Sequence, residues 1–130
     1  MTLLARPSVA VGFGLFFICA AACTHFDEIT SSPLSLVPDW AAGTLLIAAA
    51  VRSRRDGGAG RSYQVAAWAF MLSLLFASSV GSLEEWLAPE PSEATNGLVN
   101  LSLGVYLFFK AVLFLIAFGG LVSSVRATEA

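Results

Sequence analysis

One lysine lies inside the last long apolar stretch of the chain. Residues 106–116 read YLFFKAVLFLI, and Lys110 is the only charged side chain between residues 97 and 125. A charge inside a membrane is costly unless it reaches water or finds a partner. Such a lysine serves a polar cavity for a substrate or proton, forms an ion pair within the protein, or extends to the lipid headgroups. Lys110 is therefore the first candidate for chemistry.

Acidic side chains are the expected partners of Lys110. At ~1.5 Å per residue, the apolar run after Lys110 places it about 22 Å above the inner boundary of a ~30 Å hydrocarbon core, and so about 8 Å below the outer one. The same count from Arg52 places Asp39 about 20 Å above the inner boundary. We predict an Asp39–Lys110 ion pair at this depth, or a polar site that contains both. The alternative partners, slightly farther out, are Glu84 and Glu85.

The other chemistry-bearing residues form no recognised motif. Cys23, His25, Asp27 and Glu28 include metal-ligand types, but their spacing fits no defined site and they do not share one helical face. Cys19 and Cys23 are four residues apart, a spacing that places disulfide geometry out of easy reach on a helix. No phosphate loop, zinc motif or nucleophile elbow occurs. We expect no catalytic residue, no cofactor and no metal.

Small residues recur every four positions in the third apolar stretch. They are Ala69, Ser73, Ala77 and Gly81. Such a stripe lets helix backbones approach closely in lipid, so it predicts a helix-packing seam. The alternative is a hydroxyl-lined pathway through Ser73, Ser78, Ser79 and Ser82. A similar small patch near the end of the chain consists of Gly119, Gly120, Ser123 and Ser124.

The composition predicts that these candidate residues are carried by membrane helices. The 130 residues are 57% apolar and 12% charged, against roughly 45–50% and ~25% in soluble domains. A chain of this length is expected to form a single domain, residues 1–130. Four apolar stretches match the length of a membrane helix, and they predict an all-α bundle of four transmembrane helices with short loops. The predicted spans are residues 9–26, 36–51, 62–83 and 98–125.

Two of these boundaries need comment. The second span begins irregularly, because Pro38 and Asp39 lie at its start, and Asp39 is expected to cap a helix that opens at Trp40. Residues 52–61 are glycine-rich and are predicted to be a loop. Residues 1–22 also resemble a cleaved signal peptide, but the three later spans favour a retained first helix.

The charges separate by loop. The first and third connections contain acidic residues and no Lys or Arg. The acids are Asp27, Glu28, Asp39, Glu84, Glu85, Glu90 and Glu93. The middle loop is basic, with Arg52, Arg54, Arg55 and Arg61, and Arg6 and Arg126 lie near the termini. Basic residues mark the cytoplasmic side of a membrane. We therefore predict a multi-pass protein of the cell membrane whose termini and middle loop are cytoplasmic.

Several functions fit this architecture. The first expectation is a structural or accessory membrane subunit without catalytic activity, which contacts the bilayer and forms a homo-oligomer or binds a larger membrane partner. The alternative is a small oligomeric transporter or channel that uses Lys110 and the outer carboxylates in a polar cavity. An intramembrane enzyme ranks last, because no nucleophile–base set is visible in the sequence. The few basic residues give no nucleic-acid signature.

Overall fold

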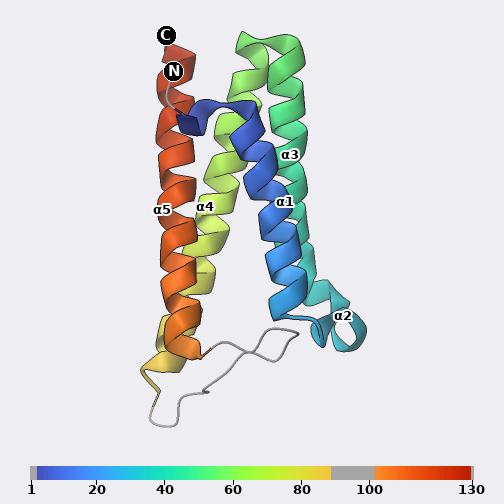
Figure 1. Ribbon diagram of the computed structural model, residues 1–130, viewed down its shortest axis with the longest axis vertical. Coiled ribbons are helices and arrows are strands. Elements are labelled where there is room, and N and C mark those ends of the chain that lie inside the picture. The colour runs from blue at the N-terminus through green and yellow to red at the C-terminus, as the bar shows by residue number, and fades with distance from the viewer. Residues whose placement is uncertain (1–2, 89–101, 130) are drawn as a thin grey trace.

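The computed structural model describes residues 3–88 and 102–129, and every element in these ranges is helical (Figure 1). The elements are η1 (Leu3–Ala5), α1 (Pro7–Thr24), α2 (Glu28–Ser31), η2 (Pro33–Leu36), α3 (Val37–Asp56), α4 (Gly58–Trp86) and α5 (Leu103–Glu129). Four segments are long and apolar enough to cross a membrane, namely Pro7–Thr24, Pro33–Asp56, Gly58–Trp86 and Leu103–Glu129. The predicted all-helical fold with four candidate spans is confirmed. The predicted start of the fourth span, at residues 98–101, lies outside the described residues.

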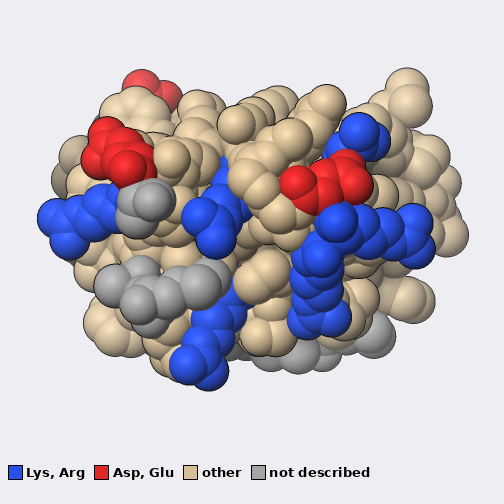
Figure 2. All heavy atoms as spheres, turned by 90° about the horizontal axis from the view of Figure 1, so that it is seen from above, with Lys and Arg blue, Asp and Glu red and all other residues tan. Residues whose placement is uncertain are grey.

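The long helices run side by side. α1 packs on α3, α3 on α4, and α4 on α5, while η1 contacts α5. Both termini and the α3–α4 connection lie at one end, here called the termini end, and α2 lies at the other (Figure 1). The other end is called the acidic end, because it holds Asp27, Glu28, Asp39, Glu84 and Glu85. Figure 2 looks onto the termini end and shows basic side chains spread across it.

The α3–α4 connection is much shorter than predicted. Residues 52–61 are not a loop, because α3 continues to Asp56 and α4 begins at Gly58. Gly57 alone joins them, with a φ of +57° that favours glycine. A Cβ on Gly60 would lie 2.7 Å from the Arg52 carbonyl oxygen, so a bare glycine lets the two helices turn this sharply. Instead of extending from a loop, the four arginines of the predicted loop lie in the adjoining helix ends: Arg52, Arg54, Arg55 and Arg61.

The start of the second span also differs in detail. The chain enters through η2, and α3 begins at Val37, three residues before the predicted Trp40. Asp39 is therefore in the first turn of α3 and makes no side-chain cap, since Leu36 is the N-cap residue. Proline fits the first turn of a helix, where its missing N–H has no intrahelical acceptor. This leaves the Asp39 side chain available to face the bundle.

Two close approaches of helices hold the core. A Cβ on Gly14 of α1 would lie 2.8 Å from the Gly43 carbonyl oxygen of α3, and the reverse substitution meets the Gly14 oxygen at 2.9 Å. On the other side, the ring of Trp68 in α4 occupies the space above Gly120 in α5 and lies 5.3 Å from the ring of Phe13. Trp68 is fully buried. The predicted small patch of α5 therefore packs within the bundle, with Ser123 and Ser124 buried beside Gly120.

The predicted stripe of α4 is not a packing seam within the chain. Ser73, Ala77 and Gly81 are exposed, Ala69 is half-buried, and no heavy atom would meet a Cβ on Gly81 within 4 Å. The buried face of α4 runs through Gln64, Ala67, Trp68, Met71, Leu75 and Ser82. Adjacent positions on a helix point about 100° apart. Ser73 and Ala77 each lie two positions after a buried residue, about 200° around the helix, so they point away from the bundle.

Candidate functional site

A cavity of about 330 Å³ opens in the half of the bundle nearer the acidic end. Residues from four elements line it, with α1 and α5 as its sides. The lining consists of Phe16, Phe17, Ala20, Ala21, Cys23, Thr24, His25, Asp39, Leu74, Leu75, Ser78, Tyr106, Phe109, Lys110 and Leu113. Its volume is near the lower limit of small-molecule pockets, roughly 300–1,000 Å³. Lys110 and Asp39, far apart in the sequence, therefore share one cavity.

The polarity of the cavity changes with depth. α1 runs toward the acidic end, so Thr24 and His25 lie nearest that end and Phe16 and Phe17 lie deeper. α5 runs the other way, so its first cavity residue is Tyr106 and its deepest is Leu113. The polar groups thus gather toward the acidic end, and the apolar side chains line the part nearer the middle of the bundle. The cavity has the polarity of a binding site for an amphiphile.

Lys110 binds α4 and does not extend out of the bundle. Its Nζ donates to Ser78 Oγ at 2.7 Å, to Ser82 Oγ at 2.6 Å and to the Ser78 carbonyl oxygen at 3.0 Å. The Nζ also lies 4.4 Å from the ring centroid of Tyr106, one turn earlier on α5, in cation–π geometry. Lys110 is only 8% exposed. Uncharged acceptors therefore satisfy all three ammonium protons.

The carboxylates predicted to pair with Lys110 do not contact it. No ion pair within 4.0 Å joins Lys110 to an acid among the described residues. Asp39 is half-buried and lines the same cavity, whereas Glu84 and Glu85 are exposed and do not line it. A polar site containing Lys110 and Asp39 replaces the direct pair. The positive charge of Lys110 therefore has room beside it for a ligand.

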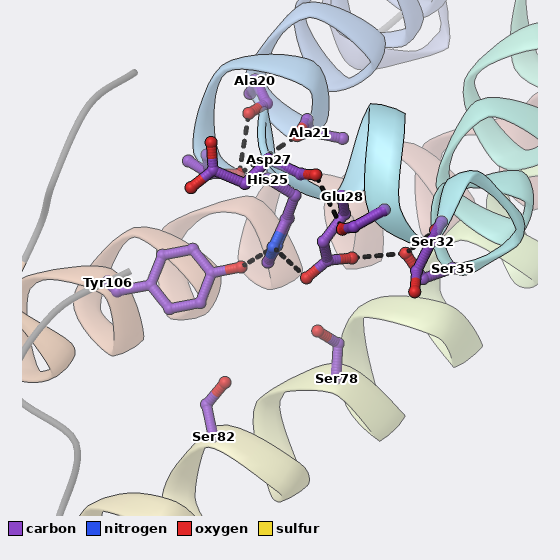
Figure 3. Close-up of polar contacts among 12 residues, drawn as sticks. Ala20, Ala21, His25, Asp27, Glu28, Ser32, Ser35, Ser78, Ser82 and Tyr106 are labelled. Carbon is purple, nitrogen blue, oxygen red and sulfur yellow. Dashed lines mark hydrogen bonds and ion pairs between the residues drawn. The ribbon is translucent and has the colours of Figure 1, made fainter. Parts of the chain in front are cut away.

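A second polar chain crosses the acidic end (Figure 3). His25 follows the last turn of α1, and its Nε2 lies 3.0 Å from the Tyr106 hydroxyl of α5. Its Nδ1 lies 3.2 Å from Glu28 Oε1, and Ser35 donates to the other oxygen of Glu28. In neutral His25, Nδ1–H donates to Glu28 while Nε2 accepts from Tyr106. This chain fixes Tyr106, and with it the aromatic face above Lys110.

The sequence-predicted metal-ligand types are not brought together as a metal site. His25 and Glu28 bond to each other, but within residues 3–88 and 102–129 no three His, Cys, Asp or Glu side chains could hold a metal ion. Cys19 and Cys23 are both free thiols. The roles of Ser78, Ser82 and Tyr106 as partners of Lys110 were missed. The spacing of Ser78 and Ser82 was a partial sequence signal, since residues four positions apart lie on the same face of a helix.

Comparison with protein-family models, with curated proteins and with solved structures gives no further guide. The chain matches none of them. Function is therefore inferred from the cavity, which combines one cation, one carboxylate, hydroxyl groups and a wall of apolar side chains. Apolar walls with a few placed polar groups are typical of small-molecule sites.

Proposed function

We propose that this protein binds a single-chain amphiphile with an anionic head, such as a fatty acid, in the cavity beside Lys110. The observation that carries the proposal is a buried ammonium on the wall of a cavity, with no carboxylate of the described residues within 4.0 Å of it. In the proposed complex the head lies beside Lys110, and the alkyl chain extends toward Phe17 and Leu113. This is the orientation that a lipid has in the leaflet at the acidic end.

Charge supports an anionic head. Ser78 and Ser82 satisfy the protons of Lys110 but carry no negative charge. A ligand carboxylate would provide the negative charge and accept one Nζ proton in place of the Ser78 carbonyl oxygen, the most distant of the three acceptors. A charge-assisted hydrogen bond of this kind contributes about 1.5–3 kcal/mol. Asp39, at the start of α3 and on the same cavity, would favour a ligand with only one acidic group, because a second would be repelled. This proposal names a ligand, which the alternative of a small transporter or channel did not. It is compatible with transport, because a carrier must first bind what it carries.

We also propose that the acidic end faces the outside of the cell membrane. All six arginines lie at the termini end: Arg6 directly precedes α1, and the other five are at the ends of α3, α4 and α5. Basic residues are retained on the cytoplasmic side of a membrane. The cavity would then accept its ligand from the outer leaflet. A fluorescent protein fused after the last residue should fluoresce, and alkaline phosphatase fused there should be inactive. The opposite result would place the cavity in the inner leaflet.

Binding is tested with cis-parinaric acid, a fluorescent fatty acid, on the protein purified in mild detergent. Lys110→Met should weaken binding about 10- to 100-fold, since it removes one charge-assisted bond to the head. The matched control is Arg54→Met, which removes an equal charge from an exposed position at the termini end and should bind like the native protein. Absence of saturable binding, or equal affinity in Lys110→Met, would contradict the proposal and favour a structural role for Lys110 between α4 and α5.

A further inference from the structure

We propose that Ser78 and Lys110 form a nucleophile–base pair that cleaves the acyl ester of an amphiphile bound in the cavity. The inference rests on the proposed function, because the ester would occupy the same cavity. The decisive observation is the distance of 2.7 Å between Lys110 Nζ and Ser78 Oγ. A nucleophile and its base lie about 2.6–3.2 Å apart in enzymes of this type, and lysine replaces histidine as the base in Ser–Lys variants.

Access distinguishes Ser78 from the neighbouring serines. Ser78 lines the cavity, so a substrate carbonyl can reach its hydroxyl. Ser82 also contacts Lys110, but it is buried and does not line the cavity. Ser73 and Ser79 donate to carbonyl oxygens one turn earlier on their own helix. Only Ser78, among the described serines of α4, combines contact with Lys110 and exposure to the cavity.

The surroundings of Lys110 suit a base. The walls beside it are apolar, with Leu75, Phe109 and Leu113 on the same cavity. No carboxylate in the described residues lies within 4.0 Å to hold the ammonium form as an ion pair. The Ser78 and Ser82 oxygens and the Tyr106 ring fix the position of the Nζ. A fixed, desolvated amine is the form in which lysine serves as a general base.

The reaction is balanced with water as the only co-reactant. Lys110 first gives one ammonium proton to water, and the neutral amine then accepts a hydrogen bond from Ser78 in place of donating to it. The amine takes the hydroxyl proton of Ser78 as Ser78 Oγ bonds to the ester carbonyl carbon. The tetrahedral intermediate then breaks its bond to the alcohol oxygen, which takes the proton from Lys110, and an acyl ester remains on Ser78. Water, entering at the polar side of the cavity, gives a proton to Lys110 as its oxygen bonds to the acyl carbon. The bond to Ser78 Oγ then breaks, Ser78 takes that proton back from Lys110, and the free acid forms and transfers its own proton to the Lys110 amine. Lys110 ends as an ammonium beside a carboxylate, which is the anion complex proposed above.

The experiment is covalent labelling of the purified protein with an alkyl fluorophosphonate, followed by mass spectrometry of the intact chain and its peptides. We expect a single adduct on Ser78, formed as Ser78 Oγ displaces fluoride. Ser78→Ala should abolish labelling. Lys110→Met should slow it by about 100-fold or more, the usual contribution of a general base. Ser79→Ala is the matched control and should label at the native rate, because the Ser79 hydroxyl bonds to the Leu75 carbonyl oxygen of its own helix and does not line the cavity. Ser82→Ala removes one bond to Lys110 but no nucleophile, so it should slow labelling by less than about tenfold.

The outcomes separate the two proposals. No adduct, an adduct on another residue, or labelling that survives Ser78→Ala overturns the catalytic inference. If cis-parinaric acid still binds in that case, the proposed function stands alone; if binding is also absent, both fail. Equal loss of labelling in Ser78→Ala and Ser82→Ala, with native melting temperatures, would reduce both serines to positioning Lys110. Should Lys110→Met not fold, the comparison of the two serine variants still decides the inference.

Discussion

Alanine at Gly43 should destabilise the bundle, whereas alanine at Gly81 should not. A Cβ on Gly43 would lie 2.5 Å from Ile18 Cγ1 and 2.9 Å from the Gly14 carbonyl oxygen. The Ile18 side chain can change rotamer, but the Gly14 oxygen moves only if α1 shifts away from α3. At Gly81 a Cβ meets no heavy atom within 4 Å. The two substitutions therefore add the same methyl group to a packed and to an open helix position.

The expected difference follows from two opposing effects. An extra carbon in a packed contact costs about 1–3 kcal/mol, and replacing glycine by alanine inside a helix recovers up to about 1 kcal/mol. Gly43→Ala should thus lower the free energy of unfolding by up to about 2 kcal/mol, and it should be about 1–3 kcal/mol less stable than Gly81→Ala. Gly81→Ala has only the helix term, so it should raise that free energy by about 0.5–1 kcal/mol.

Reversible unfolding in mixed micelles, with sodium dodecyl sulfate as denaturant and tryptophan fluorescence as the signal, measures both values. Gly12→Ala is a second open control, since a Cβ there also meets nothing within 4 Å. Equal stability of Gly43→Ala and Gly81→Ala would refute the α1–α3 contact. A loss in Gly81→Ala that grows with protein concentration would show that the stripe packs against another chain.

Three further predictions concern the core and the cavity. Trp68→Ala should lower the free energy of unfolding by about 3–5 kcal/mol, because the buried ring leaves a large void; a change under about 1 kcal/mol would show that the site collapses or is not packed. Tyr106→Phe should lower the free energy of unfolding by about 1 kcal/mol through loss of the bond to His25. His25→Ala should then lower this free energy less in the Tyr106→Phe background than in the native protein. Bound fatty acid should slow maleimide labelling of Cys23, which lines the cavity, and leave Cys19, which does not, unchanged; equal protection would mean detergent exchange and not occupancy.

Length and apolarity were sufficient to predict the four helices, but not how each is rotated about its axis. In water a helix shows its buried face by its apolar residues, whereas in lipid both faces are apolar. The stripe Ala69, Ser73, Ala77 and Gly81 was for that reason assigned to the wrong face. The same missing rotation hid the contact of Lys110 with Ser78 and Ser82, which requires knowing that these serines face α5.

The depth of a residue was easier to predict than its partner. Counting along the helices placed Lys110 and Asp39 at one level, and they do line one cavity. The partner of Lys110 depends on which neighbouring helix presents polar groups at that depth. The serine oxygens of α4 are closer to its Nζ than any described carboxylate. The prediction of a loop at residues 52–61 was wrong for another reason. Glycine lowers helix propensity, but Gly60 is required by a close backbone approach that only the folded hairpin contains.

The one-residue connection at Gly57 also bears on how the chain enters the membrane. The candidate span Pro33–Asp56, which contains η2 and α3, has the lowest mean hydropathy of the four, and it carries Asp39 in the first turn of α3. Insertion by itself is therefore the least favourable for this segment among the four. Because a single residue separates it from α4, the two helices cannot occupy distant places during biogenesis, and we expect them to enter the bilayer together as a hairpin. Lengthening the connection after Gly57 should then leave α3 uninserted in a fraction of the chains.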